Sequence, residues 1–225
     1  MPKGKNPRIS FVPLLLLALH CAPNLAAQAA PDTALIRRVD GHYNHLHSLR
    51  TRYTEHYTGM GLDRTESGTL TLKKPGLMRW SYDAPSGKLF VLDGKFAWFY
   101  TPGDAQVSRA PAKQLDDLRS PLRLLLGHTQ LAKELDQIAI APDPDSGGAD
   151  FKITGVPKGM AQRVHLLTLI VTPSGAIESM KLEETDGATT EFTFSGIEEE
   201  IALPPSEFIF TPPPGVPIVE AQPPI

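Results

Sequence analysis

Two neighbouring stretches decide the fold: residues 75–82 read PGLMRWSY, and residues 93–102 read DGKFAWFYTP. In the first stretch, large apolar residues alternate with small or polar ones, which is the two-residue period of a half-buried β-strand. The second opens with Asp93-Gly94, a dipeptide that readily supplies positive φ at a tight hairpin turn. Together they predict antiparallel strands that carry large aromatic side chains, and therefore a sheet built around an apolar interior.

The same period continues on both sides of these stretches. Strands are predicted at 88–92 and 95–101, and a second meander is predicted over 162–172, 177–184 and 189–195, with turn residues between its strands. Counting such segments gives roughly ten to twelve strands, too many for a small flat sheet to stay open without curling. We therefore predict a mainly β (α+β) fold, with a strongly curved antiparallel sheet of about 11 strands.

Two helices are expected beside this sheet. Asp32 can cap an amphipathic helix that ends near Arg50, with apolar residues at three- and four-residue intervals. A second helix can start at Ser120 and stop at Gly127 within the segment 113–137. Its leucines either form ordinary core or cover the mouth of the curved sheet; they are Leu115, Leu118, Leu122, Leu125 and Leu126.

The first 29 residues are predicted to be a cleaved secretory signal. A basic start precedes an apolar stretch, residues 11–19, that is too short to span a bilayer comfortably, and small residues follow. Cys21 lies in this segment, and a lipid-attachment site there is the alternative. However, His20 occupies the position before it, where such a site requires a small residue.

Composition narrows the classes of function. The chain has 22 basic and 25 acidic residues, and residues 1–29 hold three of the basic ones, so the mature chain carries a net charge of −6. Nucleic acid is therefore not expected as a partner. Without Cys21 the mature chain has no disulfide and no thiolate metal site. We expect one monomeric domain over 30–216 and a proline-rich flexible tail over 217–225.

Four separate motifs resemble one known family. They are the KPGLMRW run at 74–80, the hairpin at 93–102, Ser120-Pro121-Leu122, and FIFTPPPGV at 208–216. The last of these resembles the closing strand of that family. In this order they resemble the periplasmic outer-membrane lipoprotein carrier family (LolA-like), across nearly all of the mature sequence. The resemblance implies a half-open β-barrel with a helical lid, periplasmic localisation, no catalytic activity and no cofactor.

The resemblance also implies partners and a site. The cargo would be acylated lipoproteins, received from an inner-membrane ABC-type lipoprotein release complex and passed to an outer-membrane receptor or the outer membrane itself. Lys74 stands where the family carries an arginine that latches the lid, and it lacks the planar fork of donors that arginine provides. An exposed strand-end lysine is the alternative. The predicted lipid-binding cavity comprises Leu70, Leu72, Met78, Trp80, Phe96, Trp98, Phe192 and Phe194, for each of which core packing is the alternative.

Other functions find less support in the sequence. His42 and His45 lie three residues apart, but no carboxylate stands as an obvious third ligand, so they are interpreted as surface histidines and no metal is predicted. Phosphate-loop and nucleophile-elbow motifs are absent, which disfavours a hydrolase. A half-barrel sensor of the cell envelope that binds a lipid or peptide is the alternative to a carrier.

Overall fold

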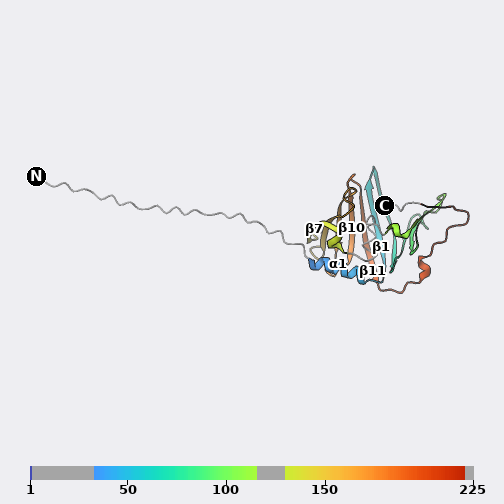
Figure 1. Ribbon diagram of the computed structural model, residues 1–225, viewed down its shortest axis with the longest axis horizontal. Coiled ribbons are helices and arrows are strands. Elements are labelled where there is room, and N and C mark those ends of the chain that lie inside the picture. Colours follow the sequence, from blue (N-terminus) through green and yellow to red (C-terminus); the bar gives the residue numbers. More distant parts are fainter. Residues whose placement is uncertain (2–32, 116–129, 221–225) are drawn as a thin grey trace.

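The computed structural model describes Met1, residues 33–115 and residues 130–220. Their main feature is a single 12-stranded sheet with the order β12-β6-β5-β4-β3-β2-β1-β11-β10-β9-β8-β7, which curves around an interior (Figure 1). All neighbouring strands are antiparallel except β12 and β6. The predicted fold, a mainly β half-open barrel of about 11 strands, is confirmed.

The elements follow one another with short connections. The strands are β1 (Ser48–Gly59), β2 (Leu62–Lys73), β3 (Leu77–Tyr82), β4 (Leu89–Asp93), β5 (Phe96–Tyr100), β6 (Val107–Pro111), β7 (Leu135–Pro142), β8 (Phe151–Pro157), β9 (Val164–Val171), β10 (Ile177–Glu184), β11 (Thr189–Glu199) and β12 (Ile218–Glu220). The helices are α1 (Thr33–His45), η1 (Ala112–Leu115), α3 (Leu131–Glu134) and η2 (Pro205–Phe208).

Helix α1 closes one end of the curved sheet, which we call the base (Figure 1). Its apolar stripe is buried, as the sequence predicts. The β9–β10 turn packs against it so tightly that a Cβ on Gly175 would lie 2.6 Å from the carbonyl carbon of Arg38. The helix ends at His45 and not near Arg50, because β1 already begins to pair with β2 at Ser48.

The sheet has apolar residues on both faces. The inner face packs with α1 into the main core, which includes Val39 and Leu70. A second, smaller core lies on the outer face around Val91, where the C-terminal segment contributes Phe210 and Val216. The outer face is therefore covered by the chain's own C-terminal segment and not by solvent alone.

The C-terminal segment differs from two expectations. Residues 208–216 do not form the closing strand that the resemblance implied, because the chain leaves η2 at Phe208 and crosses the outer face without a strand. Residues 218–220, expected in the flexible tail, form β12 and pair in parallel with β6. The ion pair between Arg109 and Glu220 holds this short strand in place.

Both edges of the sheet are short or irregular. At one edge, β12 has only three residues, all of them exposed. At the other, the pairing of β7 with β8 is interrupted between Asp136 and Ala139, where Gln137 has a φ of 54°. Within the described part of the chain, no helix is long and apolar enough to span a membrane. The predicted signal, residues 1–29, lies outside the described residues except for Met1.

Candidate functional site

The inner face changes from apolar to polar as it runs from the base to the opposite end. Along β1 the side chains on this face are Leu49, Thr51, Tyr53, Glu55 and Tyr57 in turn. Their partners on β2 are Leu72, Leu70, Gly68, Glu66 and Arg64. The register therefore places a leucine-rich floor next to α1 and charged residues at the far end.

Six of the eight predicted cavity residues lie together in the inner core. They are Leu70, Leu72, Met78, Trp80, Phe192 and Phe194, and each is at most 8% exposed. The ring of Trp80 makes edge contacts with Tyr53, at 4.5 Å between centroids, and with Phe192, at 5.5 Å. Its indole N–H points to the sulfur of Met78, 3.1 Å away. These six residues are packed against one another, and contact with a lipid stays a prediction for them.

Phe96 and Trp98 do not share that face, so their placement on it was wrong. Val91 pairs with both Arg79 and Trp98, which puts Trp98 on the outer face of the sheet. There it packs against Phe96 and Phe210 in the smaller core. Its indole N–H donates to the carboxylate of Asp93, at 2.7 Å, and this bond fixes the ring next to the hairpin turn.

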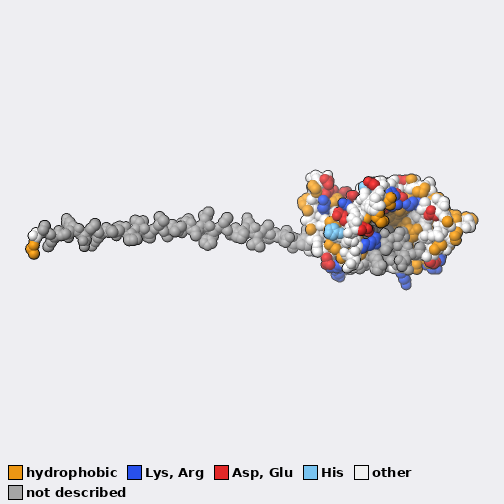
Figure 2. Space-filling view, turned by 90° about the horizontal axis from the view of Figure 1, so that it is seen from above, with side chains coloured by type: hydrophobic (Ala, Val, Ile, Leu, Met, Phe, Trp, Pro, Cys, Tyr) orange, Lys and Arg blue, Asp and Glu red, His pale blue; other side chains and the backbone are white. Residues whose placement is uncertain are grey.

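A border of partly buried apolar side chains surrounds the inner core. On one side it includes Tyr82, Phe99 and Ala112, and on the other Ile138, Ile140 and Phe151. Figure 2 looks onto the end opposite α1 and shows a hollow with hydrophobic side chains inside it and charged side chains at its border. The hollow that this view shows is thus lined by hydrophobic side chains.

The charged residues at this open end form a cluster that we call the polar rim, and the sequence did not single it out. It comprises Glu55, Arg64, Glu66 and Lys88. Lys88 donates to Glu66, and Arg64 lies 3.4 Å from Glu66 and 3.9 Å from Glu55. Burial, and then the nearby charge of Glu66, raise the pKa of Glu55 above its ordinary value.

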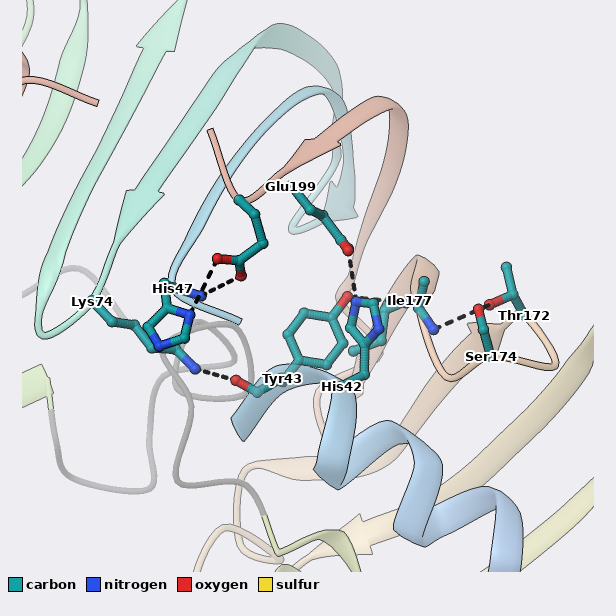
Figure 3. Close-up of polar contacts among 10 residues, drawn as sticks. His42, Tyr43, His47, Lys74, Thr172, Ser174, Ile177 and Glu199 are labelled. Atoms are coloured by element: carbon teal, nitrogen blue, oxygen red, sulfur yellow. Dashed lines mark hydrogen bonds and ion pairs between the residues drawn. The ribbon is translucent and has the colours of Figure 1, made fainter. Parts of the chain in front are cut away.

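Lys74, the predicted lid latch, contacts the base of the barrel. Its ammonium group donates to the main-chain carbonyl of Tyr43 near the C-terminal end of α1 (Figure 3). Burial lowers the pKa of Lys74, although the charge of Glu200 opposes this shift. Of the predicted lid leucines, Leu118, Leu122, Leu125 and Leu126 lie outside the described residues, and Leu115 ends η1. Contact between Lys74 and a lid therefore stays a prediction.

Lys74 also lines a pocket of about 630 Å³ next to the base. Its other lining residues are His47, Ser48, Lys73, Glu200, Ile201, Ala202, Leu203 and Pro204. Most of its polar groups already bond within the chain: Lys73 donates to the carbonyl of Leu203, and the main-chain N–H of His47 donates to Glu200. This pocket lies between the start of β1, the end of β2 and the segment that leaves β11.

Two histidines next to the base, His42 and His47, pair with carboxylates, and His45 bonds the main-chain carbonyl of Gly41. His42 lies 2.7 Å from Glu199, and both hold α1 against the end of β11 (Figure 3). The hydroxyl of Tyr43 accepts a hydrogen bond from the main-chain N–H of Ile177, at 3.0 Å. Among the described residues, no group of three or more possible ligands could hold a metal ion.

Comparisons with known proteins agree on one family. Residues 50–211 match the family described as outer membrane lipoprotein carrier protein LolA. An outer-membrane lipoprotein carrier protein of Nitrosospira multiformis is 33% identical over 158 residues, which are 69% of this chain and 73% of that one. One from Pseudomonas aeruginosa is 30% identical over 210 residues, 92% of this chain and 97% of that one.

Solved structures share the fold at low sequence identity. An uncharacterised conserved protein from Thermus thermophilus aligns with a TM-score of 0.53 at 13% identity, and the alignment covers 84% of this chain and 98% of that one. Lipoprotein LppX from Mycobacterium tuberculosis aligns with a TM-score of 0.51 at 17% identity, covering 76% and 98%. At these identities the two structures support the fold alone.

Proposed function

Because the chain belongs to the LolA family of outer-membrane lipoprotein carrier proteins, we propose that it shields the acyl chains of lipoproteins and carries them through the periplasm from the inner to the outer membrane. The observation that carries this proposal is the inner face, which is apolar, curved and bordered by half-buried side chains at its open end. An ABC-type release complex of the inner membrane would supply the cargo, and a receptor in the outer membrane would accept it. No catalytic step is part of the proposal.

The physical need for such a carrier is large. Burial of a methylene group is worth about 0.8 kcal/mol, so three acyl chains of ordinary length would cost tens of kcal/mol to expose to water. A surface that grips by area and not by directed bonds suits this cargo. We place the acyl chains against the border residues Tyr82, Phe99 and Ala112 and next to the core rings, which must separate for a chain to pass between Trp80 and Phe192.

We further propose that Lys74 couples the base of the barrel to the lid. Its ammonium group is already held by the carbonyl of Tyr43 at the end of α1. Residues 116–129, which carry the predicted lid, are the proposed partner of this contact. The ammonium group of lysine has three donors that point in different directions, whereas arginine presents a rigid planar fork of donors.

Depletion tests the proposed function. If the protein is depleted in the bacterium that produces it, lipoproteins should accumulate at the inner membrane, and the purified protein should release them from spheroplasts as a soluble one-to-one complex. Normal sorting after depletion, in a strain without a second copy, would contradict the carrier role and favour an envelope sensor.

A matched pair of variants tests the binding face. Phe99 and Tyr100 are neighbours on β5 with similar partial burial, but Phe99 packs against the inner core and Tyr100 against the outer one. Phe99→Gln should weaken binding of a synthetic tripalmitoylated Cys-Ser peptide, and Tyr100→Gln should leave it unchanged. Equal effects of the two substitutions would contradict the placement of the cargo on the inner face.

A further inference from the structure

Resting on the proposed carrier function, we propose that the hydroxyl group of Tyr53 binds an ester carbonyl at the head of the acyl chains. The inner face would then recognise two parts of its ligand. The apolar floor would hold the chains by area, and Tyr53 would mark the level at which the hydrocarbon ends and the polar linkage begins.

The position of Tyr53 on the inner face supports this assignment. It lies between the leucine-rich part of β1 and β2 and the polar rim, two residues from Glu55 along the same face. Its partner across the strand pair is Gly68, and a Cβ at Gly68 would lie only 2.7 Å from the Tyr53 hydroxyl oxygen. The ring thus lies over β2, with the hydroxyl directed toward the strand that also carries Glu66.

The hydroxyl of Tyr53 is a buried polar group that no described residue bonds with regular hydrogen-bond geometry; the residue is 1% exposed. The hydroxyl does interact with the side chain of Tyr82, and this contact lowers the pKa of Tyr82 against the larger opposite effect of burial. Leaving such a group unpaired is unfavourable, and buried polar atoms in folded proteins almost always have a partner. A ligand carbonyl that arrives at this position would therefore give the hydroxyl a better acceptor than the described residues of the empty protein provide.

The surroundings define what the hydroxyl can bind. Burial raises the pKa of Tyr53, and the neighbouring Tyr82, Glu55 and Glu66 raise it further, so the group stays protonated and can donate. An anionic partner, such as the headgroup of a free fatty acid, is not favoured here, because the nearby cations Lys88 and Arg64 are already paired with Glu66. A neutral carbonyl oxygen is the remaining simple acceptor in a lipid linkage.

A single buried donor fits an ester better than an amide. The carboxylate of Glu66 is already engaged by Lys88 and Arg64, and Lys88 also lies 4.1 Å from the ring centroid of Tyr82. An amide brings an N–H that needs an acceptor of its own, whereas an ester presents only acceptors. One buried donor is therefore sufficient for an ester.

The route to the hydroxyl passes through the contact already described. The ring of Tyr53 lies 4.5 Å from that of Trp80, and Trp80 in turn contacts Phe192. A chain that enters between Trp80 and Phe192 separates these two rings and comes next to Tyr53. An acyl chain that enters the interior by this route therefore also brings its ester group next to the Tyr53 hydroxyl.

Binding assays with two ligands and two variants test the proposal. The ligands are a tripalmitoylated Cys-Ser peptide and its analogue in which the two glyceryl chains are ether-linked and lack ester carbonyls. Wild-type protein should prefer the ester peptide by about tenfold, the usual effect of one hydrogen bond to a buried acceptor. Tyr53→Phe should lose this preference, and Tyr100→Phe, which removes a hydroxyl from the outer face, should keep it.

The outcomes separate this proposal from the carrier function. If wild-type protein binds neither ligand, the carrier function itself is contradicted. If it binds both ligands and Tyr53→Phe shows the wild-type preference, only the role of Tyr53 is overturned.

The stability of the empty protein is a second, independent test. Because no described residue bonds its hydroxyl with regular geometry, Tyr53→Phe should melt at the same temperature as the wild type or higher. A lower melting temperature would mean that the hydroxyl is already bonded in the empty protein, and would overturn the proposal.

Discussion

Replacing Gly68 by alanine should destabilise the protein strongly, although the change adds one methyl group. The new Cβ would lie 2.1 Å from the carbonyl oxygen of Ser81 and 2.7 Å from the hydroxyl of Tyr53. Ser81 cannot retreat freely, because its strand is paired with β2 on one side and β4 on the other. Overpacking of this kind costs about 3 kcal/mol, and the lower backbone freedom of alanine offsets about 0.5–1 kcal/mol. The net loss in the free energy of unfolding is about 2 kcal/mol.

Thermal unfolding followed by circular dichroism measures this effect. For a domain of this size a loss of about 2 kcal/mol corresponds to a fall in melting temperature of roughly 4–8 °C. Gly41→Ala is the matched control, since it lies in α1 with no atom within 4 Å of the added Cβ, and it should raise stability by about 0.5–1 kcal/mol. If Gly68→Ala unfolded at the wild-type temperature, the close packing of Tyr53 over β2 would be refuted.

Three further substitutions test other parts of the structure. Glu55→Gln should flatten the pH dependence of stability, measured by urea unfolding at a series of pH values. Between pH 4.5 and the raised pKa of Glu55, the folded wild-type protein binds more protons than the unfolded chain. Wild-type stability therefore falls as pH rises through this window. Asp93→Ala should cost about 1–2 kcal/mol and change Trp98 fluorescence, because the carboxylate accepts three hydrogen bonds; a wild-type free energy of unfolding would contradict this. Burial alone would raise the pKa of Asp93, but these bonds hold it below 3.8, so the stabilisation is present above that pH and is lost as pH falls through the lowered pKa. Lys74→Leu should let the protein accept cargo but block onward transfer in a spheroplast-to-outer-membrane assay, and unchanged transfer would leave Lys74 with a structural role only.

Much of the fold follows from local sequence rules. The alternation in β2 and β3, the turn at Asp93-Gly94 and the apolar stripe of α1 each predict the element that the structure contains. The turn succeeds because Gly94 adopts a φ of 89° and Asp93 caps the main-chain N–H groups that follow it. These interactions span a few residues, so the sequence pattern contains them.

The face of each residue was harder to predict where both sides of the sheet are apolar. Leu92 pairs with Ala97, so the inner face passes from even-numbered residues in β4 to odd-numbered residues in β5. The prediction placed Trp98 on the inner face because its side chain is large and apolar. Its partner on the outer face, Phe210, lies more than a hundred residues away along the chain. Contacts at that distance leave no local pattern.

The polar rim could not be predicted from local sequence, for a different reason. Glu55 and Glu66 are each unremarkable as charged residues in a strand, and only the register makes them direct neighbours. One signal was available: a glycine within an alternating strand, such as Gly68, often marks the place where a large residue on the next strand lies over the backbone. Tyr53 is that residue.

The short and irregular edges of the sheet affect the tendency of the protein to aggregate at high concentration. A half-open barrel exposes two rows of unpaired main-chain groups, which in other proteins recruit further copies and grow into fibrils. Here the three-residue strand β12 shields β6, and the irregularity near Gln137 twists β7 away from a regular ladder. Both features disfavour edge-to-edge pairing with a second copy, although the sheet is not closed into a full barrel.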